Sequence, residues 1–195
     1  MTSLEHKRHT LAHLLAQAVT NRYPNAQLTL GPAIDNGFYY DIDFGTDKIS
    51  NTDLPKLESA MRKLLPTWKE FTSQEVTKDE ALHSFSNESG ANTYKVELIE
   101  EIDARGEKIT LYSCGGFTDL CRGGHTEHPS KEIATDSFVL DRVAGAYWRG
   151  DEKNTMLTRI YGLAFDTKEE LDVYKTQREE AEKRDHKKLG RELKI

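Results

Sequence analysis

Apolar residues near the start of the chain recur at the spacing of one helix face. The positions that set this period are Leu4, Leu11, Leu14, Leu15, Ala18 and Val19. They predict an amphipathic helix over about residues 3–22, which ends at Tyr23-Pro24-Asn25. A second stripe on the opposite side of this helix contains His9, His13, Ala16 and Thr20, with the small Ala12 beside it. One face is therefore expected to be core, and the other is expected to form the wall of a pocket.

Further along the chain, alternating and continuous apolar runs predict strands. Residues 38–44 alternate as a strand directly after the turn residues 35–37, which predicts a hairpin. The other expected elements are a surface helix over 52–65, a strand over 70–77, a short helix over 78–86, a helix over 94–99, a strand over 108–114 and a long hairpin made of the runs 137–147 and 156–165. Helices mixed with antiparallel strands, without a regular βαβ alternation, predict an α+β domain.

The composition changes at Thr167. The sequence Thr167-Lys-Glu-Glu170 has the pattern of a capping box, and a charged stretch with few apolar residues follows it to Ile195. This pattern predicts a long helix that leaves the domain and needs a partner surface. We therefore divide the chain into a domain over 1–166 and a linker helix over 167–195.

Charge and composition narrow the class of protein. The chain of 195 residues has a formal net charge of -6, and the acidic excess lies within the first 140 residues, which argues weakly against nucleic acid as a partner of that part. No apolar run is long enough for a membrane span, and the first residues lack the pattern of a signal peptide, so a cytoplasmic protein is expected. Cys114 and Cys121 are too few for a disulfide framework, and we expect both to be reduced.

Two pairs of residues carry metal-binding or catalytic side chains at helical spacing. His9 and His13 lie four residues apart, and Cys121 and His125 repeat that spacing with a thiol. Each pair alone is a weak signal, but together they make a possible zinc quartet. Asp119 could orient an imidazole or anchor a substrate amine. The chain lacks a nucleophile elbow, a Walker loop and a dinucleotide fingerprint, which disfavours serine hydrolases, NTPases and dinucleotide enzymes.

Six blocks of sequence, in order and at workable spacings, carry a resemblance to a known family. They are His9-x-x-x-His13, Ile34-Asp-Asn-Gly-Phe-Tyr-Tyr-Asp41, Asp119-Leu-Cys-Arg-Gly-Gly-His125, Ala144-Gly-Ala-Tyr-Trp-Arg-Gly-Asp151, Arg159-Ile-Tyr-Gly162 and Lys183-Arg-Asp-His-Lys-Lys-Leu-Gly190. Nearly the whole chain resembles the N-terminal editing region of bacterial threonyl-tRNA synthetases. The resemblance implies an antiparallel sheet wrapped around a long central helix, a fold shared with the editing domains of alanyl-tRNA synthetases.

The resemblance also implies an activity, the hydrolysis of serine mischarged onto tRNA(Thr). Serine lacks only one methyl group of threonine, and a binding pocket discriminates a methyl by only about 1–3 kcal/mol. A second pocket that admits serine and rejects threonine would supply the remaining accuracy. The small residues beside His9 and His13 are suitable walls for such a pocket.

Carried over residue by residue, the site of that family falls on seven positions. They are His9, His13, Tyr40, Lys95, Asp119, Cys121 and His125. His9 and Lys95 would position or activate water and stabilise the oxyanion, whereas the others would shape the pocket and hold the aminoacyl end. Contacts with tRNA are expected at Arg122 beside the site and at Arg149, Lys153 and Arg159 in the later segment.

The chain departs from the family at three places. Gly124 stands where the family usually has proline, which loosens the turn before His125. The small ubiquitin-like domain that commonly precedes this region is missing, and so is the class II catalytic core that follows it. We therefore expect a fragment whose partners are tRNA(Thr) and the missing catalytic and anticodon-binding domains, without a membrane partner. The parent protein would be a homodimeric threonine–tRNA ligase, with ATP, magnesium and zinc bound in the absent core.

Several alternatives remain open at this stage. The quartet of His9, His13, Cys121 and His125 could close around zinc in a non-catalytic RNA-binding module. Cys121 could be the nucleophile of a thiol hydrolase. The chain could also be a freestanding trans-editing deacylase. Zinc itself is undecided, because the alanyl branch of the editing fold binds it, whereas the threonyl branch resembles a site that works with water and side chains alone.

Overall fold

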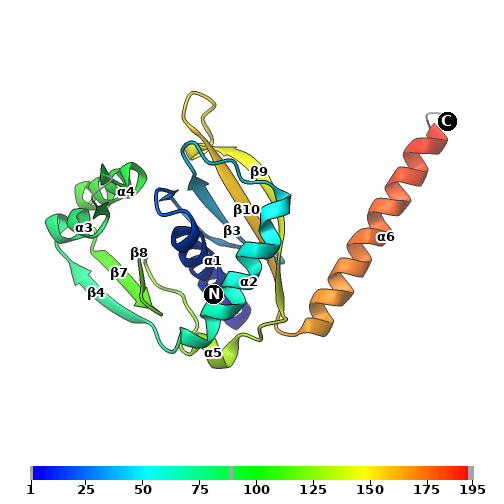
Figure 1. The fold of residues 1–195 in the computed structure, drawn as a ribbon, viewed down its shortest axis with the longest axis horizontal. Helices are drawn as coiled ribbons and strands as arrows, with labels where there is room; N and C mark the ends of the chain where they lie inside the picture. Colours follow the sequence, from blue (N-terminus) through cyan, green and yellow to red (C-terminus); the bar gives the residue numbers. More distant parts are fainter. Residues whose placement is uncertain (1, 88–89, 193–195) are drawn as a thin grey trace.

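A long helix lies at the centre of the computed structural model, which describes residues 2–87 and 90–192. This helix, α1 (Ser3–Arg22), begins at Thr2, whose side chain and that of Glu5 form a capping box. Both of its faces are buried, because the leucines pack into the main core and His13 and Gln17 are also covered. The predicted helix over 3–22 is confirmed, and Figure 1 shows it between two groups of strands.

The larger sheet packs against the leucine face of α1. Its antiparallel strands are ordered β1-β3-β10-β9, and β2 pairs with the first two residues of β3. Their bounds are β1 Gln27–Leu28, β2 Ala33–Ile34, β3 Gly37–Asp43, β9 Phe138–Tyr147 and β10 Met156–Ala164. Phe38, Tyr40 and Ile42 of β3 are fully buried against the helix. The strand predicted over 38–44 and the hairpin predicted from 137–147 and 156–165 are both confirmed.

A smaller sheet covers the histidine stripe on the other side of α1. It has the order β4-β7-β8, with β4 Thr72–Val76, β7 Ile109–Cys114 and β8 Phe117–Leu120. Helices α3 (Lys78–Ser84) and α4 (Thr93–Ala104) pack beside it around a second apolar cluster that contains Ala81, Ile99 and Ile102. The antiparallel α+β fold wrapped around α1 agrees with the sequence prediction.

Shorter elements complete the domain. They are the 3₁₀ turns η1 (Asn51–Asp53), η2 (Leu65–Thr67) and η3 (Trp148–Gly150), the helices α2 (Leu54–Leu64) and α5 (Pro129–Glu132), and the strands β5 (Ser86–Asn87) and β6 (Gly90–Ala91). The helix predicted over 52–65 corresponds to α2, whose Leu57 and Met61 are fully buried. Among the described residues, no helix is both long and apolar enough to cross a membrane.

The last helix, α6 (Lys168–Glu192), extends away from the sheets, as Figure 1 shows. Among the residues whose side chains are described, Leu171 is buried against the domain, and Arg178 makes two hydrogen bonds to Asp141 at 2.6 and 3.0 Å. The predicted capping box is half formed, because Thr167 caps the helix while Glu170 accepts from the Asp166 backbone. Residues 193–195 of the predicted helix lie outside the described residues.

Candidate active site

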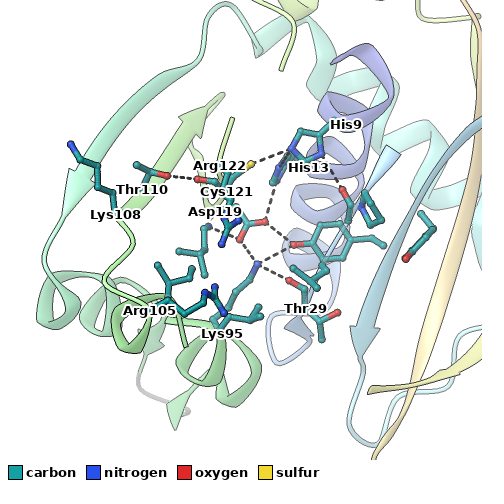
Figure 2. Close-up of a pocket in the computed structure, with 18 residues that line it drawn as sticks. His9, His13, Thr29, Lys95, Arg105, Lys108, Thr110, Asp119, Cys121 and Arg122 are labelled. Atoms are coloured by element: carbon teal, nitrogen blue, oxygen red, sulfur yellow. Dashed lines mark hydrogen bonds and ion pairs between the residues drawn. The ribbon is translucent and has the colours of Figure 1, made fainter. Parts of the chain in front are cut away.

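A cavity of about 360 Å³ opens where α1, α4 and the end of β8 meet the chain segment 29–32. Apolar side chains and backbone form most of its wall, and a few charged groups converge at its base. The lining residues that the argument below uses are His9, His13, Tyr40, Lys95, Asp119 and Cys121. Figure 2 shows His9 and His13 entering from α1, Lys95 from α4, Asp119 from β8, and Cys121 from the chain directly after β8.

Three histidines and one cysteine meet at one end of this cavity. The helical spacing of His9 and His13 brings their Nε2 atoms to 3.3 Å. The Cys121 sulfur lies 3.1 Å from His9 Nε2 and 3.5 Å from His125 Nε2. His125 is held flat against Phe71, with the two ring centroids 4.0 Å apart. The side chains of the two predicted pairs therefore form one cluster, although the pairs are more than a hundred residues apart in the chain.

A buried ion pair lies directly behind the cluster. Lys95 Nζ and Asp119 Oδ1 are 2.6 Å apart, and their side chains are 1% and 2% exposed. Asp119 also accepts a hydrogen bond from Tyr40 at 2.7 Å and pairs with His13 Nδ1 at 3.1 Å. Lys95 donates in addition to the Thr29 carbonyl at 2.8 Å. The carboxylate of Asp119 and the ammonium of Lys95 therefore make all their hydrogen bonds within the protein, and these bonds fix both side chains before any ligand binds.

These contacts shift the proton affinities of the buried groups. Burial would raise the pKa of Asp119, but Lys95 and His13 outweigh it and hold that pKa well below its usual range. Burial would lower the pKa of His13, but the bonds to Asp119 and Cys121 raise it to about 9. At neutral pH the base of the cavity therefore contains an ionised Asp119 between the positive Lys95 and a protonated His13.

The two cysteines differ in their chemistry. Burial would raise the pKa of Cys121, but its contacts with His125, His13 and His9 lower it to about 3. Cys114 is buried at the end of β7, and burial raises the pKa of its thiol to about 11. Cys121 is therefore a thiolate at neutral pH, and Cys114 is a thiol.

Comparison with known proteins identifies the relatives of this chain. The family described as "Threonyl and Alanyl tRNA synthetase second additional domain" matches residues 109–161. A threonine–tRNA ligase of Thermotoga petrophila is 49% identical over 98% of this chain and 29% of its own length. A threonine–tRNA ligase of Francisella philomiragia is 48% identical over 97% of this chain and 29% of its own length. One of Borrelia turicatae is 46% identical over 96% of this chain and 31% of its own length.

Nearly the whole chain is similar to a part of threonine–tRNA ligases. It spans less than a third of the length of these relatives. The family match begins at the first residue of β7 and runs through Asp119, Cys121 and His125 into β10. Part of the cavity therefore lies in the region that defines the family, whereas His9, His13 and Lys95 come from the chain before it.

The geometry of the cluster fits zinc. Zn–N distances of about 2.0–2.1 Å in a tetrahedral site place two ligand nitrogens about 3.3–3.4 Å apart, which is close to the separation of His9 and His13. The four ligand atoms of His9, His13, Cys121 and His125 all lie within 4.8 Å of one another. The other ring nitrogens of His9 and His13 contact the Gly31 carbonyl and Asp119, the kinds of partner that orient metal-bound histidines.

The predicted contacts with tRNA lie at different places. Arg122 lines the cavity, with an exposed side chain that pairs with Glu107. Arg159 is held by Asp41 through two hydrogen bonds of 2.7 and 2.8 Å on the outer face of the sheet. Arg149 pairs with Glu101 at 2.5 Å at the tip of the β9–β10 hairpin, where Lys153 is exposed. The last three residues are not among those that line the cavity.

Sequence reasoning missed the backbone groups that hold the site. The Thr29 carbonyl accepts a hydrogen bond from Lys95 and the Gly31 carbonyl contacts His9, and neither backbone group has a signal in the residue type. A Cβ on Gly31 would lie 2.2 Å from the Tyr40 ring, so this position needs glycine. The expected pocket wall is also different, because Ala12 and Ala16 are fully buried and are not among the lining residues.

The turn before His125 explains the presence of Gly124. Gly123 and Gly124 have φ angles of 92° and 88°, which proline cannot adopt. A Cβ at Gly123 would also lie 2.6 Å from the Tyr112 hydroxyl. In this chain, contacts of His125 with Phe71 and Tyr112 hold the ring in place.

Proposed function

We propose that the cavity hydrolyses the ester bond of seryl-tRNA(Thr). The observation that carries this proposal is the fixed set of charges at the base of a small cavity: Lys95, Asp119 and His13, with His9 at its wall. Similarity to part of these relatives supplies the substrate class, because their named activity concerns threonine and its tRNA. A cavity of about 360 Å³ suits a small ligand such as an aminoacylated terminal adenosine.

His9 is the proposed base for the attacking water. Its Nδ1 lies 3.2 Å from the Gly31 carbonyl, which can only accept a hydrogen bond, so Nδ1 carries the hydrogen and Nε2 is the nitrogen that can take a proton. Nε2 takes a proton as water adds to the ester carbonyl carbon. The bond to the ribose oxygen then breaks, that oxygen receives a proton, and serine and the tRNA hydroxyl leave.

Lys95 and His13 supply positive charge on the side of the cavity where the oxyanion develops. Because Lys95 donates to Asp119, Thr29 and, at 3.4 Å, Tyr40, its role is to hold Asp119 and to stabilise negative charge from a fixed position. Asp119 in turn keeps His13 protonated. Tyr40 and Cys121 would shape the wall, His125 would hold Cys121 from outside the cavity lining, and Arg122 would meet the 3′ end of the tRNA.

We infer further that the longer protein to which such a chain belongs joins threonine to tRNA(Thr) with ATP. Its partners would be tRNA(Thr) and the catalytic and anticodon-binding domains of the synthetase. The inference rests on the names of the relatives, which this chain covers only in part.

Replacement of His9 by alanine tests the proposed site. We expect the single-turnover rate of serine release from seryl-tRNA(Thr) to fall by about 10²–10⁴-fold, the usual contribution of a positioned acid or base. His83→Ala, which changes an exposed histidine of α3, is the matched control and should leave the rate unchanged. A loss of less than about threefold in His9→Ala would remove His9 from the reaction.

A zinc-stabilised, non-catalytic module is the second candidate, and the convergence of four donor atoms favours it. Four protein ligands would close a tetrahedral site and leave no position for water. Our proposal predicts that seryl-tRNA(Thr) hydrolysis survives dialysis against a chelator. Stoichiometric zinc, together with a lower melting temperature and lost RNA binding after chelation, would support the second candidate instead.

A further inference from the structure

The outer face of the larger sheet has a row of stacked side chains next to the cavity. Phe38 and Tyr40 of β3 and Ile160 of β10 point into the core, so their strand neighbours point outward. The strand register places Tyr161 directly opposite Tyr39 on one side and Arg142 on the other. Three adjacent strands thus contribute one side chain each to a single row, and Figure 1 shows β3, β10 and β9 side by side.

Two arginines stack on the two tyrosines of this row, one of them Arg159 from the neighbouring outward position of β10. The Arg142 guanidinium lies 4.0 Å from the centre of the Tyr161 ring, and that of Arg159 lies 3.8 Å from the centre of Tyr39. The two tyrosine rings are 5.8 Å apart. We call the four residues Tyr39, Arg159, Tyr161 and Arg142 the Tyr–Arg ladder. Its planar groups are fixed, since Asp41 holds Arg159 with two hydrogen bonds.

The ladder is accessible and continuous with the cavity. Tyr39 belongs to both, because it also lines the cavity. At the other end, the Arg142 side chain is 55% exposed. Arg142 donates a hydrogen bond to its neighbour Asp141 at 3.2 Å, but that carboxylate also accepts two hydrogen bonds from Arg178, so one carboxylate faces two guanidinium groups. Arg142 therefore keeps positive charge available to a ligand. The neighbouring outward position on β9, opposite Arg159, is Ala144. Its small side chain does not rise above the stacked rings, so a ligand can approach them.

We propose that the Tyr–Arg ladder binds the single-stranded 3′ end of tRNA, just before the nucleotide whose ester enters the cavity. The proposal rests on the function proposed above and extends it to a part of the substrate that does not react. Tyrosine rings and guanidinium planes on an open sheet are suited to stack unpaired bases, and arginine can also pair with phosphate. Two strand spacings of about 4.8 Å give the ladder a span of about 10 Å, enough for two or three nucleotides.

Binding of RNA hairpins tests the ladder directly. The probe is an uncharged hairpin with the tRNA(Thr) acceptor stem and its four unpaired 3′ nucleotides, and a hairpin without the unpaired end is the comparison. For the first hairpin, we expect the Kd to rise about tenfold in Tyr161→Leu and about threefold or more in Arg142→Ala. Arg184→Ala on α6, a matched exposed arginine, should leave the Kd unchanged. The melting temperature of each variant shows whether it is folded. Because Arg142 is an exposed side chain, Arg142→Ala should leave the melting temperature nearly unchanged.

The results separate this proposal from the proposed function. In single-turnover hydrolysis of seryl-tRNA(Thr), ladder variants should need more protein for half-maximal rate and should reach the same maximal rate. The proposal that the ladder binds RNA would be overturned by any of three results. These are an unchanged Kd in both variants, an equal rise of the Kd for the hairpin without the unpaired end, and no binding of either hairpin by the unaltered chain. A chain that binds the hairpin through the ladder but releases no serine would reject the proposed hydrolysis and leave the ladder supported.

Discussion

Lys95 and Asp119 are two charged residues that the fold covers almost completely. Such a pair adds little to stability by itself, because both ions lose their hydration on folding. Removal of one partner would leave an uncompensated buried charge and cost about 3–5 kcal/mol. The contacts of Asp119 with Tyr40 and His13 offset part of this cost of burial. A buried pair at the base of a cavity is thus more readily explained by chemistry than by stability.

The contrasting pKa values of the two cysteines predict selective alkylation. Only the thiolate reacts with iodoacetamide, and the pKa of Cys121 is lowered to about 3, whereas that of Cys114 is raised to about 11. We expect labelling at pH 7 to modify Cys121, which lines the cavity, and to spare buried Cys114. Mass spectrometry of the digested protein gives the position. Equal labelling of both residues would contradict the arrangement of the cluster.

At the residue scale, local spacing could predict one part of the site. His9 and His13 are four apart on a helix, and so their side chains had to share a face. The same reasoning could not find Lys95, because the sequence around it reads as an ordinary exposed helix. Its burial depends on Asp119, which comes from another element, and on the Thr29 carbonyl, which carries no signal in the residue type.

At the scale of elements, the tip of the β9–β10 hairpin holds α4, the helix that carries Lys95. Trp148 donates through Nε1 to Glu97 at 2.7 Å and packs against Tyr94. Arg149 adds ion pairs with Glu97 and Glu101. Arg149 is therefore engaged within the domain, which gives it a structural role in addition to the tRNA contact expected from its charge.

Charge reversal at this tip distinguishes the two roles. Arg149→Glu would place a third carboxylate beside Glu97 and Glu101, and we expect the free energy of unfolding to fall by about 1 kcal/mol. Lys153→Glu changes an exposed residue of the same loop and should alter stability by less than about 0.5 kcal/mol. Urea unfolding measures both. Equal stability of the two variants would argue that the ion pairs of Arg149 contribute nothing.

Element types were more predictable than element ends. The helix expected over 94–99 runs from Thr93 to Ala104, because Asn92 caps its start and Ile99 and Ile102 bury one face. The period of those apolar residues becomes clear only when Ala81 and Ile109 are known to lie opposite them. The two-residue strands β1 and β2 have no pattern long enough to detect, and they exist because β3 offers them a partner.

On the scale of the whole molecule, one face of α1 packs in the hydrophobic core and the other face carries residues of the candidate site. Its leucines pack against the larger sheet, while His9 and His13 meet the chain that follows the smaller sheet. The cavity therefore exists only when both sheets are assembled on the helix. The sequence resemblance predicted this arrangement, but neither periodicity nor composition could predict which side chains would close the cavity.

The most direct test of the proposed function compares two esters of the same tRNA. Single-turnover rate constants for hydrolysis of seryl-tRNA(Thr) and threonyl-tRNA(Thr) should be measured with the unaltered chain in excess. Exclusion of the threonine methyl predicts that the seryl ester is hydrolysed about 10–200 times faster. Equal rate constants for the two esters would contradict an editing role for the cavity.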